Sequence, residues 1–368
     1  MVHPGDDAAR RCPVAIKLGL GLDLYRGAQL ELPVEQVQRA ESLGYHSVWT
    51  AEAYGADALS PLAFLAAVTR RIKLATGVVQ TAARTPAATA MHAMTIDALA
   101  GGGRTIIGLG LSGPQIVEGW YGRPWGSPNA VLRDYVAIMR KVLARDEPLI
   151  HDGPEYPLPT TASGSVGSGK ALKSILHPHP GIEIWLAAGG PRNTELAAQV
   201  ADGWLPMGFG ADGLDVHGAA LARGSSKRSP ALGALEIFGG INIEICTDVA
   251  AAIERRKPLT AMYVGGMGSA THNFHRDAMA RRGYSIEADR IQGLWLAGRK
   301  QEAVAAVPDE YIEQGAALGP PDRIRRVWAD HVHPGVTGLI VRSGQDEALD
   351  LAAELAEIEP PADLQEEP

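Results

Sequence analysis

Short apolar segments alternate with amphipathic segments along almost the whole chain, and this rhythm limits the possible folds more than any other feature. The apolar segments lie at residues 14–22, 46–50, 72–79, 105–111, 182–188, 203–209, 235–246 and 337–342. Each is nearly continuous in apolar residues, as strands buried on both faces are, and a helical pattern follows each one. Eight such units predict an α/β fold, the (β/α)8 TIM barrel. An open doubly wound sheet is the alternative, but no convincing G-x-G-x-x-G turn follows the first segment.

Capping residues mark where several of these helices begin. Ser60 is predicted to be an N-cap with Pro61 in the first helical position, and Thr85 stands before Pro86 in the same way. A weaker helical pattern lies near 212–223. The helices therefore fall between the predicted strands, as the barrel requires.

The chain has 368 residues, which is more than the ~250 of a simple barrel. Two segments account for the excess. Residues 151–181 are irregular and rich in Gly, Ser and Pro, and residues 258–333 have a largely helical pattern. We expect a single TIM-barrel domain over residues 1–368, with these two insertions and with frayed tails at 1–12 and 359–368.

Composition excludes several classes of function. The net charge of −8 argues against a nucleic-acid-binding protein, which would normally present a basic face. No apolar run approaches the ~18 residues of a membrane helix. Cys12 and Cys246 are far apart and show no disulfide or zinc spacing, which favours the reducing cytoplasm. The histidine pairs in "HPHP" and "HVHP" are held extended by prolines, so we predict surface or turn positions and no metal site.

The stretch "GSVGSGKA", Gly164–Ala171, is one residue short of the nucleotide-binding P-loop pattern. A working P-loop needs a buried strand before it and a helix after it. The preceding "YPLPTTAS" is polar and proline-rich, the following "LKSILHPHPG" is broken by prolines, and Ala171 replaces the magnesium ligand. A P-loop nucleotide hydrolase is therefore excluded as an interpretation.

The active site of a TIM barrel lies at the carboxyl ends of its strands, so residues there are the site candidates. Asp23 and Tyr25 follow the first predicted strand, and Glu52 and Tyr54 follow the second. Arg84 lies just past the third and could pair with a carboxylate or phosphate, or cap the rim. Two glycine-rich corners after strands four and five precede helices, whose free N–H groups suit a phosphate. These corners contain Ser112, Gly113, Pro114 and Gln115, and Gly189, Gly190 and Pro191.

Five long blocks resemble the luciferase-like monooxygenase superfamily, and more narrowly its actinobacterial branch that uses the deazaflavin coenzyme F420. The resemblance runs from about residue 14 to 342, nearly the whole chain. The blocks are "SVWTAEAYGADALSPLAFLA", "LATGVVQTAARTPAATAMHAMTIDALAGG", "IIGLGLSGPQIVEGWYGRPW", "WLAAGGPRNTELAAQVADGWLP" and "YVGGMGSATHNFHRDAMARRGY".

The resemblance implies a TIM barrel with an insertion region and a non-prolyl cis peptide bond after strand three, here Gly77–Val78, which supports the bent deazaflavin. It also implies that the cofactor phosphate lies near Ser112–Gln115 and near Gly189–Pro191. Related proteins are often homodimers, which is our expectation for the partner. The family's insertion region implies that residues 151–181 form a lid at the barrel mouth, with Lys170 and Lys173 as candidate anchors for an anionic group; a solvated loop is the alternative.

The chain departs from the pattern of F420-using relatives at two positions. A catalytic histidine of some relatives falls at Ala53, and a glutamate used by others after strand four is replaced by the Gly113–Pro114 corner. Glu52 and Tyr54 are therefore our candidate proton donors, although each could instead serve in binding.

Three functions stay open. The first is an F420-dependent oxidoreductase that transfers a hydride between reduced deazaflavin and an activated C=C, C=N or C=O bond of a small organic metabolite. The second is an FMN-dependent monooxygenase of the same superfamily, and the third is a non-enzymatic flavin or deazaflavin carrier. Substrate contacts are predicted for Asp23, Tyr25, Arg84, Trp120 and Tyr121, while Trp49 belongs either to this wall or to the core.

Overall fold

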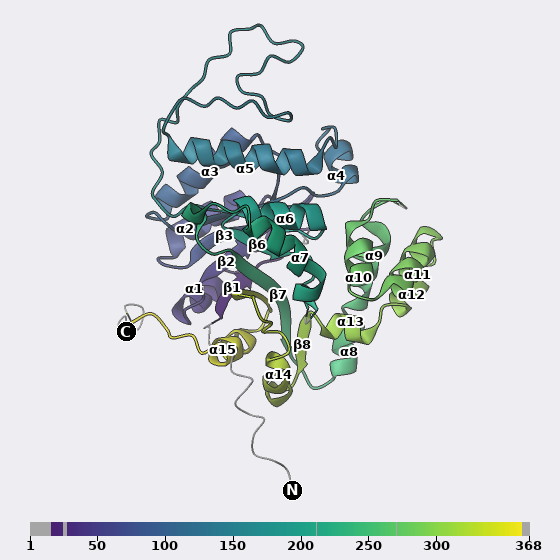
Figure 1. Cartoon of the computed structure of the whole chain (residues 1–368). Coiled ribbons are helices and arrows are strands. Elements are labelled where there is room, and N and C mark those ends of the chain that lie inside the picture. Colours follow the sequence, from purple (N-terminus) through teal and green to yellow (C-terminus); the bar gives the residue numbers. More distant parts are fainter. Residues whose placement is uncertain (1–15, 25–27, 211, 270, 363–368) are drawn as a thin grey trace.

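The computed structural model describes residues 16–24, 28–210, 212–269 and 271–362. Strands lie at the centre of the molecule and helices surround them, with a long loop that projects at the top of Figure 1 and a group of short helices at one side. The predicted tail at 1–12, with Cys12, and the candidate Tyr25 lie outside these ranges. No helix within them is both long enough and apolar enough to span a bilayer.

In the described part of the chain, eight parallel strands form a closed barrel. They are β1 (Lys17–Gly21), β2 (Ser47–Thr50), β3 (Lys73–Gln80), β4 (Thr105–Gly110), β5 (Glu183–Ala188), β6 (Gly203–Pro206), β7 (Glu236–Ile245) and β9 (Gly338–Arg342). Hydrogen bonds join them in the order β6–β5–β4–β3–β2–β1–β9–β7, and β6 also pairs with β7, which closes the barrel. The predicted TIM barrel is confirmed, and each predicted strand is present.

Helices between the strands cover the barrel. They are α1 (Val34–Ser42), α2 (Leu59–Val68), α3 (Pro86–Leu99), α4 (Pro114–Gly119), α5 (Pro128–Ala144), α6 (Pro191–Val200), α7 (Gly213–Ser225) and α15 (Asp346–Leu355). As predicted, Thr85 caps α3, and its hydroxyl accepts a hydrogen bond from Ala88 N at 3.3 Å. The predicted cap of α2 is wrong. Asp57 Oδ1 accepts from Leu59 N at 2.8 Å and from Ser60 N at 2.9 Å, because the helix begins at Leu59, two residues earlier than expected.

A layer of aromatic side chains fills the interior of the barrel. Trp49, Trp185 and Phe238 meet there, with ring centroids 4.9 to 5.9 Å apart. Aliphatic residues of other strands complete the layer: Ala75, Ile106, Leu205 and Ile340. Trp49 is thus a core residue and not part of an exposed pocket wall.

The segment at 258–333 is mostly helical, as predicted, but it also contains a strand. Its elements and the helix before it are α8 (Val249–Glu254), α9 (Lys257–Gly266), α10 (Phe274–Arg281), α11 (Ser285–Leu296), α12 (Lys300–Ala305), α13 (Asp309–Glu313), β8 (Ala316–Gly319) and α14 (Pro321–Trp328). The strand β8 pairs with the second half of β7, from Asn242 to Ile245. The helices pack around a small core of their own, which includes Ile253, Met279 and Ile291. The prediction of a largely helical segment did not include this strand at Ala316–Gly319.

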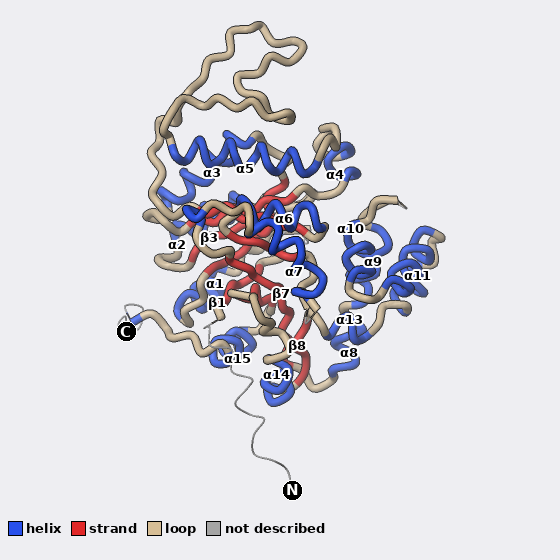
Figure 2. Tube along the Cα trace, viewed as in Figure 1, coloured by secondary structure: helices blue, strands red, loops and turns tan. Residues whose placement is uncertain are grey.

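The irregular segment at 151–181 is loop throughout, apart from one bridge between His151 and Leu158 (Figure 2). It connects the end of α5 with the start of β5, so it leaves and re-enters the barrel on the face opposite the carboxyl ends of the strands. Lys173 Nζ donates to Asp146 O at 2.9 Å, just beyond α5. Both Lys170 and Lys173 line a groove of about 970 Å³ against α3 and α5. These contacts lie along α3 and α5, and the role of the segment as a lid remains a prediction.

Candidate active site

Glycines replace side chains at the carboxyl ends of several strands, above the aromatic layer. A Cβ atom on Gly77 would lie 3.2 Å from Trp49 Cε3 and 3.7 Å from Leu205 Cδ1, so this position faces the barrel interior. Gly21, Gly189 and Gly240 follow the same inward alternation on β1, at the end of β5 and on β7. The strand ends therefore carry no side chain at these inward positions, where other barrels place bulky residues, and neighbouring side chains such as Arg342 and Met207 approach them.

The predicted cis peptide bond between Gly77 and Val78 is present. The carbonyl of Val78 accepts a hydrogen bond from Glu52 N at 3.2 Å, which ties the end of β3 to the loop after β2. The pairing of β3 with β4 shifts register at this point, between Thr76 and Val79. Val78 packs over Gly110, where a Cβ would lie 2.5 Å from Val78 Cγ2. The cofactor-binding role of Gly77 and Val78 remains a prediction.

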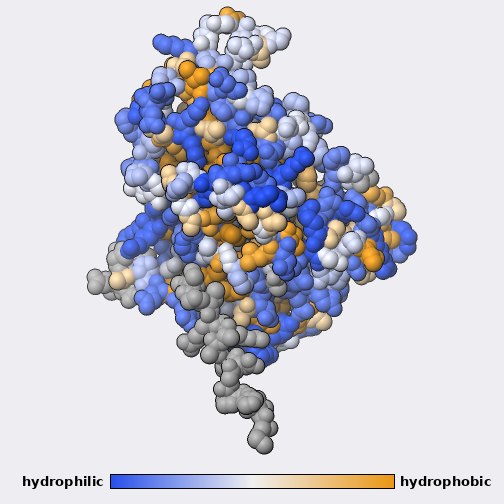
Figure 3. All heavy atoms as spheres, in the orientation of Figure 1, coloured by the Kyte–Doolittle hydropathy of each residue, from blue (hydrophilic) through white to orange (hydrophobic). Residues whose placement is uncertain are grey.

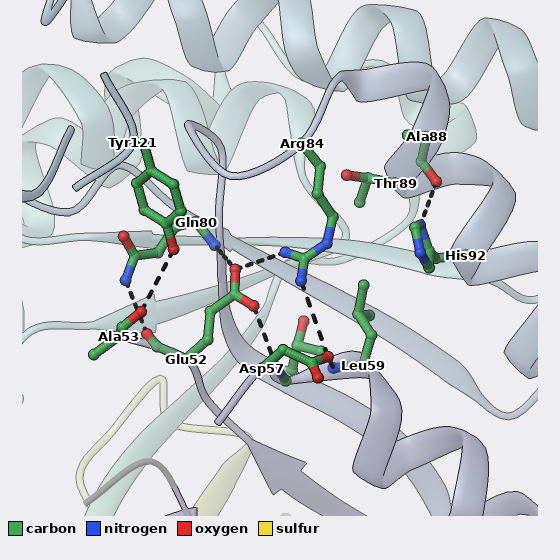
Figure 4. Close-up of polar contacts among 12 residues, drawn as sticks. Glu52, Ala53, Asp57, Leu59, Gln80, Arg84, Ala88, Thr89, His92 and Tyr121 are labelled. Carbon is green, nitrogen blue, oxygen red and sulfur yellow. Dashed lines mark hydrogen bonds and ion pairs between the residues drawn. The ribbon is translucent and has the colours of Figure 1, made fainter. Parts of the chain in front are cut away.

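The carboxylate of Glu52 is buried and receives three hydrogen bonds (Figure 4). Its Oε1 accepts from Arg84 Nη1 at 2.7 Å and from Gln80 N at 2.8 Å, and its Oε2 accepts from Ala58 N at 3.3 Å. The Glu52 side chain is 3% exposed and that of Arg84 is 18% exposed, so the pair is largely shielded from water. Both oxygens act as acceptors, which assigns Glu52 to holding the β2 and β3 loops together.

Arg84 is fixed from several directions. Its Nη2 lies 3.9 Å from Asp57 Oδ1, the cap of α2, and its carbonyl accepts from the hydroxyl of Tyr135 at 3.2 Å. Burial lowers the pKa of the Arg84 guanidinium, but the hydrogen bond and attraction to Glu52 outweigh it and hold the pKa above its ordinary value. Arg84 therefore stays charged and joins α2, β3 and α5. Its predicted contact with substrate remains a prediction.

Gln80 was not singled out from the sequence, yet it lies at the centre of this network. Its Nε2 donates to the carbonyl of Glu52 at 3.0 Å, while its Oε1 is buried and has no partner in the described part of the chain. An unpaired buried acceptor is costly unless a ligand or water supplies a donor. Gln80 is the last residue of β3, and the positional rule that selected Glu52 could have selected it.

Three aromatic residues lie at the rim near Glu52. The exposed rings of Tyr54 and Trp120 have centroids 6.4 Å apart. The hydroxyl of Tyr121 points to the carbonyl of Ala53, 3.4 Å away (Figure 4). Burial and the charge of Glu52 raise the pKa of Tyr121, so this hydroxyl keeps its proton. The three rings form an aromatic edge beside Glu52. The catalytic role of Glu52 and of Tyr54, the predicted proton donors, remains a prediction.

Both glycine-rich corners lie at helix starts, as predicted. Gly113 is the N-cap of α4 with Pro114 in the first turn, Gln115 follows, and Ser112 has a left-handed backbone with φ of 62°. Gly190 is the N-cap of α6 with Pro191 in the first turn and has no side-chain cap. The amides at these helix starts are thus available to an anionic ligand.

Asp23 lies on the other side of the mouth, beside Arg342. A Cβ atom on Gly21 would lie 2.9 Å from Arg342 Cγ, and one on Gly240 would lie 2.9 Å from Arg342 Nη1, so two glycines make room for this side chain. Arg342 Nε is 3.6 Å from Asp23 Oδ1, and both residues line a cavity of about 940 Å³ together with Asn242. Sequence analysis missed Arg342, although it is the last residue of β9.

The histidine pairs were predicted to take surface or turn positions. His331 lies in a turn, as the prediction allows, and both His331 and His333 are buried and do not lie at the surface. His333 packs against Phe209, with ring centroids 6.1 Å apart. Among the described residues, no group of three or more His, Cys, Asp or Glu side chains is arranged to hold a metal ion.

A model of the luciferase-like monooxygenase family matches residues 15–338. The chain belongs to this family. The chain is also similar, over nearly its whole length, to a protein of Mycobacterium tuberculosis named "putative coenzyme F420-dependent oxidoreductase". The two are 43% identical over 344 residues, which cover 92% of this luciferase-like chain and 98% of that protein.

Solved structures share the fold of this luciferase-like protein. The coenzyme F420-dependent tetrahydromethanopterin reductase of Methanopyrus kandleri has a TM-score of 0.73 at 22% identity, and the match covers 93% of this chain and 98% of the reductase. An F420-dependent secondary alcohol dehydrogenase, solved with an F420–acetone adduct, has a TM-score of 0.71 at 16% identity over 94% of this chain and all of that chain. At these identities, the matches establish the shared barrel.

Proposed function

We propose that this protein is an F420-dependent oxidoreductase, which transfers a hydride between the deazaflavin and an activated C=C, C=N or C=O bond of a small organic metabolite. The observation that carries the proposal is the 43% identity, over nearly the full length of both chains, to the mycobacterial protein named for F420. The residues at the barrel mouth support it further.

The mouth fits a flat ring joined to a phosphate. Inward-facing Gly77 has no side chain that would hinder the approach of a flat ring above Trp49. The uncapped start of α6 at Gly190 provides N–H donors for an anion, and the buried acceptor of Gln80 provides a partner for a ring N–H group. When bound, reduced F420 supplies a two-electron hydride, so the protein must position the acceptor and provide a proton.

The residues around the mouth would then have two roles, positioning of the loops and contact with the substrate. Glu52 and Arg84 form the buried pair that holds the loops after β2 and β3 in place. Tyr54 and Trp120 provide an exposed aromatic edge for the substrate, and the Tyr54 hydroxyl, which bonds to no other described residue, is the candidate that could give a proton directly. Proper placement of the two reactants is the main source of rate in such a site.

An anaerobic titration with F420, with FMN as the comparator, tests the cofactor. We expect the purified protein to bind F420 more tightly than FMN. Tight FMN binding without F420 binding would contradict the proposal and favour the FMN-dependent monooxygenase. If F420 binds but reduced F420 is not oxidised by any member of a panel of activated ketones, enones and imines, the non-enzymatic carrier is favoured instead.

The proton donor is tested by Tyr54→Phe, which keeps the ring and removes the hydroxyl. We expect kcat to fall at least tenfold with F420 affinity unchanged, because general acid catalysis contributes about 10²–10⁴-fold. Trp120→Phe is the matched control for a change in the same aromatic edge. Full turnover by Tyr54→Phe would remove this residue from the mechanism.

A further inference from the structure

Arg342 points into the barrel from the end of β9, one level above the aromatic layer. Ile340 belongs to that layer, and side chains two residues apart on a strand lie on the same face. The strand β9 pairs with β1 on one side and with β7 on the other. Gly21 of β1 and Gly240 of β7 carry no side chain beside Arg342, and a Cβ atom on either would lie 2.9 Å from it. The barrel therefore admits an arginine at its mouth.

The guanidinium of Arg342 donates no hydrogen bond to any residue that the structure describes. Within these residues its ion pair is with Asp23, whose Oδ1 lies 3.6 Å from Nε, beyond hydrogen-bond distance. The other unpaired carboxylate that lines the cavity, Glu31, is exposed to water. The Arg342 side chain is 34% exposed, so it is partly withdrawn from water without acceptors in exchange. Its five N–H donors are free for a ligand, and a planar guanidinium binds two oxygens of one oxyanion side by side.

Arg256 lines the same cavity of about 940 Å³, but its charge is matched within the protein. Its Nη1 donates to Glu244 Oε2 at 2.6 Å and to the carbonyl of Ala252 at 2.9 Å. Burial raises the pKa of Glu244, but the hydrogen bonds from Arg256 and Arg255 outweigh it and hold the pKa below its ordinary value. Among the described residues of this cavity, Arg342 is therefore the arginine whose donors have no acceptor.

The cavity lies on the side of the mouth away from the predicted cofactor residues. Arg342 and Asp23 lie at the ends of β9 and β1, whereas Gly77–Val78, Ser112–Gln115 and Gly189–Pro191 lie at the ends of β3, β4 and β5. In the hydrogen-bonded order of the barrel, β2 separates these two groups of strands. With the deazaflavin on the side of β3 to β5, the free guanidinium faces the space that is left for the second reactant.

We infer that Arg342 binds an oxyanion of the substrate, a carboxylate or a phosphate, so that the activated C=C, C=N or C=O bond belongs to a small organic acid or phosphate ester. The inference rests on the proposed function and names the substrate class within it. The guanidinium holds the charged end of the substrate at β9 and so orients the reducible bond at the mouth. Arg342 is a binding residue and takes no part in the hydride step.

The test compares pairs of compounds that share a reducible bond and differ in whether they carry an oxyanion. Pyruvate, benzoylformate and crotonate, each with its methyl ester, test a carboxylate, and dihydroxyacetone phosphate with dihydroxyacetone tests a phosphate. Each compound is titrated by calorimetry into the full-length protein saturated with oxidised F420. Oxidised F420 has no hydride to give, so Kd is measured without turnover, and kcat/KM with reduced F420 is measured separately.

Three variants change Arg342 or its surroundings. Arg342→Gln removes the charge, and Arg342→Lys keeps the charge without the fork of donors. Gly240→Ala keeps the arginine but displaces its guanidinium, because the added Cβ would lie 2.9 Å from Nη1, at the flexible end of the side chain. Arg256→Gln is the matched control, since it removes a charge from the same cavity while Arg255 still pairs with Glu244.

We expect at least one anion to bind the wild type about tenfold or more tightly than its neutral partner. Arg342→Gln should weaken binding of that anion by about tenfold or more, as the loss of a charge-assisted hydrogen bond does, with the Kd of the neutral partner and of F420 unchanged. Arg342→Lys and Gly240→Ala should show a smaller loss of the same kind, and the control should match the wild type. The pair that shows the preference assigns the carboxylate or the phosphate.

The inference is overturned if no anion binds more tightly than its neutral partner. It is also overturned if Arg342→Gln weakens both members of a pair equally, which would show a merely structural role, or if it weakens F420 binding and leaves the anions unaffected. The proposed function fails separately, if the wild type binds no deazaflavin. The titrations are then repeated without cofactor: a preference for an anion that Arg342→Gln abolishes would keep the anion site alone, and no preference would overturn both statements.

Discussion

Glu52 shows how a residue can be located from the sequence while its role depends on neighbours that the sequence does not reveal. Its position after β2 marked it as a site residue, and a catalytic acid was one interpretation. The structure surrounds its carboxylate with three donors, of which Arg84 and Gln80 come from the end of β3 and the loop after it. A carboxylate that accepts hydrogen bonds at both oxygens is suited to holding the loop after β2 and the loop after β3 together.

The substitution Glu52→Gln tests this interpretation. The amide oxygen can still accept from Arg84 and Gln80, but the amide NH2 group then faces the N–H of Ala58, and the buried guanidinium loses its counter-charge. We expect the free energy of unfolding to fall by about 2–4 kcal/mol. Urea denaturation measures the change, with the exposed Glu35→Gln as control. A loss no larger than that of the control would contradict the positioning role.

A second prediction at this scale concerns His331, which is buried. Burial, followed by the proximity of His333, lowers its pKa to about 4. Between the unfolded value near 6.5 and about 4, the unfolded chain binds a proton that the native protein does not. Stability from this group is therefore complete above pH 6.5 and is lost as the pH falls towards 4.

The measurement is the slope of unfolding free energy against pH. Wild type should lose up to about 1.4 kcal/mol more per pH unit than His331→Gln over this window. His92→Gln, at an exposed position on α3, is the control and should keep the wild-type slope. Parallel curves for wild type and His331→Gln would show that His331 titrates normally.

At the scale of single elements, strands with long apolar runs were predictable and short or capped features were not. Each barrel strand was found because it is buried on both faces and flanked by helices. The strand β8 was missed because "AALG" has four residues, which also fit a helical pattern.

The start of α2 was missed for a related reason. Both Asp57 and Ser60 are good capping residues, and Pro61 drew the prediction to Ser60. The geometry decides for Asp57, which also lies near Arg84. We expect Asp57→Ala to lower the free energy of unfolding by about 1 kcal/mol, and Ser60→Ala to change it by less than about 0.5 kcal/mol. Equal effects in urea denaturation would contradict this assignment.

At the scale of the whole molecule, we propose that α2 and α3 form the interface of the expected homodimer. The helix α2, "LSPLAFLAAV", carries no charged residue, whereas a helix on a free surface has a polar outer face. Phe64 of α2 and Met91 of α3 are 56% and 60% exposed, and the two helices pack side by side. Figure 3 shows further hydrophobic atoms at the foot of the projecting loop. Two apolar residues of the segment 151–181, Leu172 and Ile175, are exposed.

Sedimentation of wild type should therefore give a dimer, and Phe64→Glu with Met91→Glu should give a folded monomer, because two charges would be buried on each side of the contact. Ile286→Glu, an exposed apolar position on α11, is the control and should leave the dimer intact. A monomeric wild type would show that there is no homodimer interface. A double variant that is still a dimer, with native stability, would show that the interface lies elsewhere.

The aromatic layer inside the barrel has an optical consequence. Trp49 and Trp185 lie directly beneath the strand ends that would hold the deazaflavin, and both are shielded from water. Buried indoles emit at shorter wavelengths than exposed ones, and a violet-absorbing ring above them would accept their excitation energy. Binding of the cofactor should thus quench the blue-shifted emission of these buried indoles, so that the fluorescence of the protein itself reports whether the site is occupied.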